Sequence, residues 1–165
     1  MNILETEPIG TVRRNHGIEH ATVHVLTERH PSIRLVGRAD TTGFNIYGDV
    51  PTAELESAAE QALARLKNGE GNLAVHPRCG TNLVVAGVVT AVSAVIAMGR
   101  KPSIRKLPDV ILATTLAAYV AQPLGLKLQE YVTTSPDAFG ARIAGIRESN
   151  LGQIRVQHVD VEWRG

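Results

Sequence analysis

The sequence has a single cysteine and almost no net charge, and each of these shortages excludes a class of protein. Cys79 is the only cysteine among 165 residues, so the chain cannot build an internal disulfide framework. Its 17 Lys and Arg residues nearly balance its 16 Asp and Glu residues, which leaves a formal net charge of +1. Without a strong positive field to steer the chain toward nucleic acid, we expect no nucleic-acid partner.

The sequence shows no internal repeats and no low-complexity tracts, and we do not expect export through a secretory signal peptide. Its first ten residues, MNILETEPIG, contain two glutamates and no long apolar run, which is unlike a secretory signal peptide. A chain of 165 residues can bury one substantial core but is short for two. We therefore expect one structural unit over residues 1–165.

Two long apolar runs dominate the second half of the chain. Residues 83–98 and 110–126 carry no charge, and the basic loop RKPSIRK at 100–106 joins them. Runs of 16 and 17 residues lie at the lower edge of what spans a bilayer. They predict a helical hairpin with two spans in the cell membrane and the lipid bilayer as a partner. Their short length and the interruption at Gln122-Pro123 leave a second interpretation, a soluble oligomer with a buried hairpin.

The sequence gives opposed indications of membrane topology. The positive-inside rule places the basic loop in the cytoplasm and both polar parts of the chain outside. An N-terminal region of about 80 residues would then have to cross the membrane without a signal peptide. The side on which the polar parts lie stays open.

Hydrophobic periodicity predicts an α+β fold. Residues 11–29 have helical spacing, with Ile18, Ala21 and Val25 on a packing face and the histidines opposite. The other predicted elements are a β-hairpin of strands 33–39 and 44–50, a helix from its N-cap Thr52 to Asn68, and a C-terminal strand pair, 142–147 and 153–163, with a bulge near His158. We divide the unit into an α/β metal-binding part (11–82), the apolar hairpin (83–132) and the C-terminal strand pair (133–165).

The string HGIEH at residues 16–20 is the most informative motif. On a helix, His16 and His20 lie one turn apart on the same face, which suits the nitrogen ligands of a tetrahedral zinc ion. Glu19 lies beside them and is placed to accept a proton from a water that the metal acidifies. The motif predicts a Zn²⁺ site with His16 and His20 as ligands and Glu19 as the catalytic base.

The motif needs at least one more ligand from elsewhere in the chain. We favour His76 or Cys79, because Pro77 and Gly80 would hold them in a fixed turn and both residue types bind zinc well. If both bind, the site is closed and structural. The weaker candidates are Glu60, Glu70 and His24, of which His24 lies roughly 12 Å from His16 along the helix axis. We expect Arg13 and Arg14 to be solvated charges in the first turn.

Two resemblances follow from these residues. The HxxEH pattern resembles that of the inverzincin (pitrilysin-like) metallopeptidases over those five residues. Four longer segments resemble a bacterial family of small proteins of unknown function with two predicted membrane segments; they are NHGIEHATVHVL, GFNIYGDVPTAELESAAEQALARLKNGE, LAVHPRCGTNLVV and AQPLGLKLQEYVTTSPD. This second resemblance implies a compact N-terminal part, an apolar hairpin and a short tail.

The sequence thus supports two classes of function. The leading hypothesis is a membrane-associated zinc metalloprotein that acts as a hydrolase of peptidase type on a peptide substrate. The alternative is a noncatalytic membrane protein or a subunit of a larger assembly, in which the same residues hold a structural metal or only bond to one another. The protein partners we consider are a second copy of the chain, in a homo-oligomer, and a membrane complex.

Overall fold

The computed structural model describes residues 2–164 and has the α+β layout that the sequence predicts. Its main elements are α1 (Ile9–Arg29), β1 (Val36–Ala39), β2 (Gly43–Tyr47), α2 (Thr52–Lys67), α3 (Gly80–Met98), α4 (Leu107–Leu128), β3 (Ala141–Leu151) and β4 (Ile154–Trp163). The chain divides into two compact units. One comprises the described residues up to His76 and from Glu130 onward, and the other comprises Pro77–Gln129.

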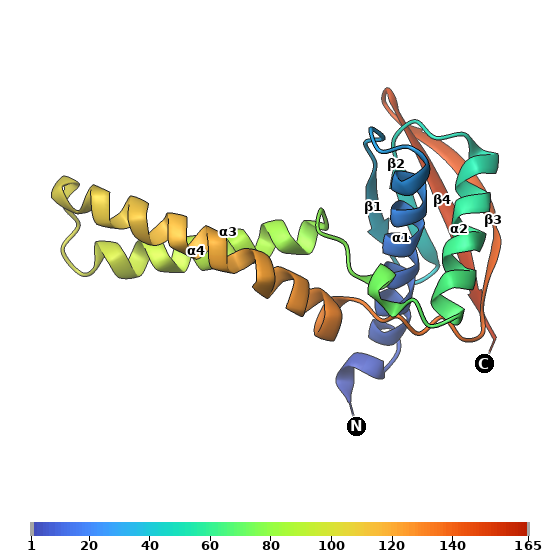
Figure 1. Ribbon diagram of the computed structural model, residues 1–165, viewed down its shortest axis with the longest axis horizontal. Coiled ribbons are helices and arrows are strands. Elements are labelled where there is room, and N and C mark those ends of the chain that lie inside the picture. Colours follow the sequence, from blue (N-terminus) through green and yellow to red (C-terminus); the bar gives the residue numbers. More distant parts are fainter. Residues whose placement is uncertain (1, 165) are drawn as a thin grey trace. The chain divides into compact units, whose positions relative to one another are not determined.

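The first unit is built on an antiparallel sheet in the order β1-β2-β4-β3. Figure 1 shows α1 and α2 on one face of this sheet. Side chains alternate along the strands, so Phe44 and Ile46 of β2 point into the core beside Val159 and Val161 of β4. Ile18 of α1 meets them there with the apolar stripe of α2. The two predicted strand pairs therefore join into one sheet through β2 and β4.

The predicted bulge near His158 is wrong, because β4 keeps its register and the bulge lies in β3. Ile143 pairs with Val161 and Gly145 with Asp160, so Ala144 is the extra residue. The change of phase in the β4 sequence has another origin. Gln157 takes an inward position, where it is fully buried and its amide donates to the Val50 carbonyl at 2.8 Å.

Thr52 opens α2 but does not cap it. The N-cap residue is Pro51, which makes no side-chain hydrogen bond to the helix. The Thr52 hydroxyl donates instead to the Glu148 carboxylate in β3. The Thr52 hydroxyl therefore bonds to a residue that is distant in the sequence, and not to the backbone of its own helix as the sequence predicts.

The α1 helix is buried on nearly all sides rather than on one face. Its buried residues include Arg13, Asn15, Glu19 and His20 as well as the apolar stripe. The segment after α4 covers part of the polar side: the Ser135 N–H donates to the Arg13 carbonyl at 3.0 Å. At Gly17 a β-carbon would lie 2.1 Å from the Ser135 carbonyl oxygen, so this close crossing requires glycine.

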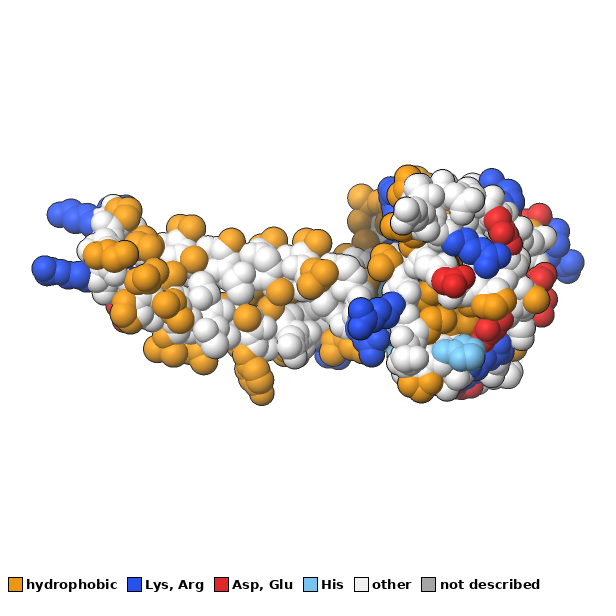
Figure 2. Space-filling view, turned by 90° about the horizontal axis from the view of Figure 1, so that it is seen from above, with side chains coloured by type: hydrophobic (Ala, Val, Ile, Leu, Met, Phe, Trp, Pro, Cys, Tyr) orange, Lys and Arg blue, Asp and Glu red, His pale blue; other side chains and the backbone are white. Residues whose placement is uncertain are grey.

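The second unit is a hairpin of α3 and α4, both of which are long and apolar enough to cross a membrane. With 19 residues, α3 is about 28 Å long, close to the thickness of the hydrocarbon core of a bilayer. Figure 2 shows apolar side chains exposed along the hairpin and Lys and Arg side chains where its helices are joined. There Lys106 also donates to the Met98 carbonyl at the end of α3.

Gly17→Ala should destabilise the protein, although alanine normally favours a helix. The added methyl group would overlap the Ser135 backbone, which cannot move as a side chain end can, and we expect a loss of about 1–3 kcal/mol. Gly87→Ala in α3 is the matched control, because a β-carbon there meets no atom within 4 Å. Thermal unfolding in detergent, followed by circular dichroism, measures the stability of both variants. Equal stability of the two would contradict the close contact between Gly17 and the Ser135 backbone.

Candidate functional site

The HGIEH motif lies in the middle of α1, and the structure brings its two histidines together. The ring centroids of His16 and His20 are 4.3 Å apart and the rings meet edge to face. Residues four positions apart on a helix lie side by side on the same face, as these two rings do. The local geometry expected from the sequence is therefore present.

Both rings bind a backbone carbonyl through the same nitrogen. His16 Nδ1 lies 2.9 Å from the Thr133 oxygen, and His20 Nδ1 lies 2.8 Å from the Ala74 oxygen. A carbonyl can only accept, so each Nδ1 carries a hydrogen, and in the neutral form of each ring the lone pair is on Nε2. Zinc-binding histidines are oriented by the same kind of Nδ1–H bond to a backbone oxygen.

Burial keeps His20 in the form that binds metal. The pKa of His20 is lowered from 6.5 to about 3, chiefly because burial penalises the charged ring and further because His16 lies beside it. His20 is therefore neutral throughout the physiological range. A metal ion does not have to displace a proton from this ring.

The side chain of Glu19 is buried against β1, the strand at one edge of the sheet. A β-carbon at Gly37 of β1 would lie 2.0 Å from Glu19 Oε1, so the carboxylate rests against the bare backbone of that strand. The sequence gives no sign of this role for Gly37, because nothing in the hairpin pattern distinguishes it from other strand glycines. Its role is to leave room for the carboxylate that HxxEH supplies.

The two favoured third ligands, His76 and Cys79, have different surroundings, and only Cys79 joins His16 and His20 in the candidate metal site. His76 is buried between two histidines of α1, with its ring centroid 5.9 Å from that of His20 and 4.6 Å from that of His24. Cys79 follows it by three residues, so the chain itself keeps the thiol near these rings. One ligand atom from each of His16, His20 and Cys79 lies within 4.8 Å of the others, which makes this group a candidate His/Cys metal site.

The other weak candidates have different partners. His24 Nε2 lies 2.9 Å from the Val75 carbonyl oxygen, and Glu70 pairs with Arg65 at 2.8 Å. Glu60 lies on the exposed side of α2.

Arg13 is not the solvated charge that the sequence suggests. Its buried guanidinium donates to the carbonyls of Tyr131 and Thr134, at 3.3 and 3.0 Å, and pairs with Glu5 at 2.6 Å. These bonds hold the segment whose Thr133 carbonyl accepts the His16 hydrogen bond. Arg13 therefore positions the His16 ring from a distance, and only tertiary structure could reveal it.

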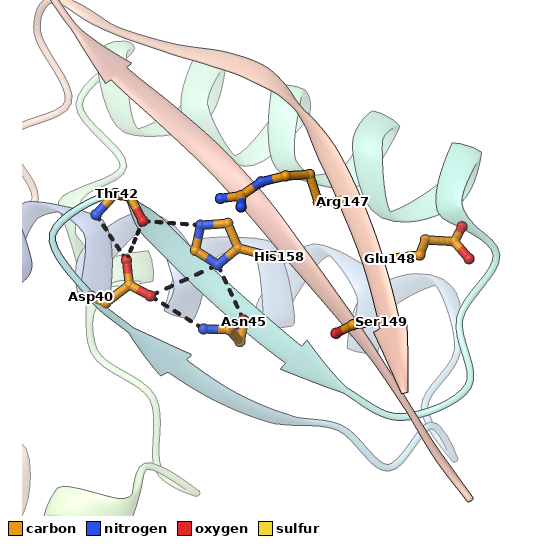
Figure 3. A pocket seen from close by; sticks show the side chains of 7 residues that line it. All are labelled: Asp40, Thr42, Asn45, Arg147, Glu148, Ser149 and His158. Carbon is orange, nitrogen blue, oxygen red and sulfur yellow. Dashed lines mark hydrogen bonds and ion pairs between the residues drawn. The ribbon is translucent and has the colours of Figure 1, made fainter. Parts of the chain in front are cut away.

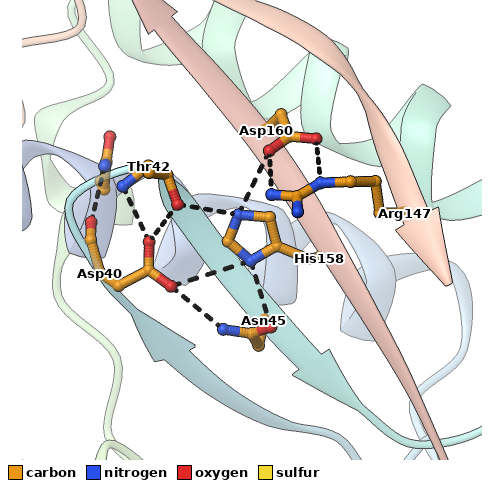
Figure 4. A network of polar contacts seen from close by, with 7 residues as sticks. Asp40, Thr42, Asn45, Arg147, His158 and Asp160 are labelled. Atoms are coloured by element: carbon orange, nitrogen blue, oxygen red, sulfur yellow. Dashed lines mark hydrogen bonds and ion pairs between the residues drawn. The ribbon is translucent and has the colours of Figure 1, made fainter. Parts of the chain in front are cut away.

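A second polar cluster occupies the sheet face opposite the helices (Figure 3). His158 Nδ1 donates to the Asn45 amide oxygen at 3.1 Å, and Arg147 forms two hydrogen bonds with Asp160, at 2.6 and 2.8 Å (Figure 4). The Arg147 guanidinium holds the pKa of Asp160 below its ordinary value. These side chains bind one another and form a bonded surface network.

Acidification should destabilise the metal-free protein because of His20. The His20 pKa is about 3 in the folded chain, against an ordinary value of 6.5, so between these values the unfolded chain holds one more proton. The unfolding free energy should decrease by up to about 1.4 kcal/mol for each unit by which the pH is lowered. Denaturant titrations between about pH 6.5 and 5, above the carboxylate range, measure this slope. His20→Gln should flatten it, and an unchanged slope in that variant would count against a buried neutral ring.

Comparison with known proteins places this chain in a family. The family model described as "Domain of unknown function (DUF6391)" matches residues 11–146. An uncharacterized protein of Picosynechococcus sp. (strain ATCC 27264 / PCC 7002 / PR-6) is 37% identical over 135 residues, which cover 75% of this chain and 66% of the relative. The chain thus spans about two thirds of that relative's length, and no solved structure matches it. The inverzincin resemblance stays a prediction. Because the family model covers most of the sequence, the chain belongs to the DUF6391 family.

Proposed function

We propose that this protein is a membrane-associated zinc metalloprotein that hydrolyses peptide bonds. One observation carries the proposal: one ligand atom from each of His16, His20 and Cys79 lies within 4.8 Å of the others. The Nδ1 bonds of both rings to backbone carbonyls leave Nε2 as the nitrogen that each neutral ring offers to a metal. Two nitrogens and one sulfur are a donor set that zinc accepts readily. The hairpin of α3 and α4 supplies the membrane attachment.

Three protein ligands suit catalysis, because zinc is tetrahedral and keeps its fourth position for water, which it acidifies. Glu19 would accept the proton from that water and later return it to the leaving amine. The Gly37 backbone fixes the carboxylate by packing against it.

A noncatalytic zinc protein is the second candidate, and His76 is the observation in its favour. His76 is buried with its ring centroid 5.9 Å from that of His20. A small movement toward the metal would add a fourth protein ligand. Four protein ligands close a zinc site to water and make it structural.

Metal content is the first test. Protein purified in detergent without added chelator should contain about one equivalent of zinc. His16→Ala and His20→Ala should lose it, whereas His30→Ala should keep it, because His30 pairs with Glu54 at the surface. Metal-free wild-type protein that also fails to bind added zinc would refute the metal centre.

Catalysis needs a separate test with the zinc-loaded protein. Glu19→Gln and Gly37→Ala should retain zinc but lose hydrolysis of a mixed peptide library by at least about a hundredfold, since a positioned base contributes 10²–10⁴ in rate. Glu60→Gln, which changes an exposed glutamate of α2, should behave as wild type. A zinc-loaded wild type that cleaves no peptide would leave the structural alternative in place.

A further inference from the structure

We propose that the metal centre lies at the lipid–water interface and that its substrate is a peptide segment held at the membrane surface by its own anchor. This inference rests on the proposed function and specifies the substrate class for the same site. It follows from how α1 holds the two chain segments that lead into and out of the hairpin.

The α1 helix binds both of these connecting segments through backbone carbonyls. On the segment that leads to α3, His20 bonds to Ala74 and His24 bonds to Val75. On the segment that leaves α4, Arg13 and His16 bond to residues 131, 133 and 134. The residues that carry the HxxEH chemistry are thus the residues that hold the connections to the hairpin.

The length of chain between these bonds and the hairpin is short. Beyond Leu128 the α4 helix continues as a π-helix, Gln129–Thr133, so Thr133 lies only about 9 Å along the helix from Lys127. On the other side, Gly80 follows Ala74 by six positions, a span of at most about 20 Å when extended. These limits come from the chain alone and hold for any orientation of the two units.

Polar residues mark where the hairpin leaves the apolar phase. Lys127 lies in the last turn of α4, and Gln129 and Glu130 begin the π-helix that follows it. At the other end of the hairpin, Thr81 and Asn82 precede Leu83, the first large apolar residue of α3. Gln129 Nε2 donates to Asn82 Oδ1 at 2.7 Å, so both helices reach this boundary at one level. The headgroup layer beyond such a boundary is about 5–8 Å thick. Thr133 follows Gln129 by four residues, about 6 Å along a helix, so Thr133 and the His16 ring that bonds to it lie in this layer or just beyond it.

A site at this depth favours one kind of substrate. A peptide bond close to the membrane anchor of another polypeptide is confined to the same thin layer as the metal centre, which raises its effective concentration. A peptide free in bulk water has no such advantage.

The depth of the metal centre can be measured with cobalt(II) in place of zinc. In vesicles that contain the full-length protein, bound cobalt should quench a fluorophore on lipid headgroups more than one at the acyl chain ends. A chelator should restore the fluorescence, and His16→Ala should show no quenching. Cobalt that binds, as its visible absorption reports, without quenching the headgroup probe would overturn the interfacial position. If the absorption shows no bound cobalt, the metal site of the proposed function fails as well.

The substrate class is tested with one peptide library in two forms, free and N-palmitoylated, in the same vesicles with the zinc-loaded protein. We expect the anchored form to be cleaved at least about tenfold faster, a modest part of the gain that tethering can give. Equal rates would overturn the anchored-substrate proposal but keep the hydrolase. Release of fatty acid from the vesicle lipids with intact peptides would also overturn it, in favour of a lipid ester. Cleavage of neither form would mean that the hydrolase itself fails.

Discussion

The hydrogen bonds from histidine Nδ1 atoms to backbone carbonyls are the interaction on which the rest of this structure depends. They pin the segments around Ala74 and Thr133 onto α1, and these segments in turn bury the polar side of that helix. Burial suppresses protonation of His20, and the same bonds aim the Nε2 lone pairs away from the backbone. One set of contacts therefore fixes the chain path, the protonation state and the ligand geometry together.

Burying so many polar side chains in one helix is costly unless each finds a partner, because an unsatisfied buried group costs about 1–3 kcal/mol. In α1 the partners are specific: Asn15 donates to the Asp40 carbonyl and accepts from the Trp163 indole, and Arg13 binds three carbonyls. Such a network tolerates few alternative arrangements. It surrounds the helix turn that carries HxxEH with specific partners, and a metal site requires its ligands to be oriented by such surroundings.

The sequence predicted what depends on neighbours along the chain and missed what depends on distant ones. Hydrophobic periodicity and run length sufficed for the order of elements and the hairpin of apolar helices, and helical spacing sufficed for the adjacency of His16 and His20. The union of the two strand pairs through β2 and β4, the burial of Arg13 and the role of Gly37 all require contacts across the fold. Gln157 shows the difference most clearly, because an inward-facing amide with a backbone partner reads in the sequence as a break in the strand.

The choice between a catalytic and a structural centre depends on His76. Its ring lies nearer to that of His24 than to that of His20, at 4.6 against 5.9 Å, and the carbonyl bond of His24 to Val75 holds the start of the same turn. In the proposed metal centre, the packing against His24 would hold His76 away from the metal and leave Cys79 as the third ligand. His24 lies too far along α1 to share a metal with His16, and its part in the proposed centre would be to keep the fourth position open to water by holding His76.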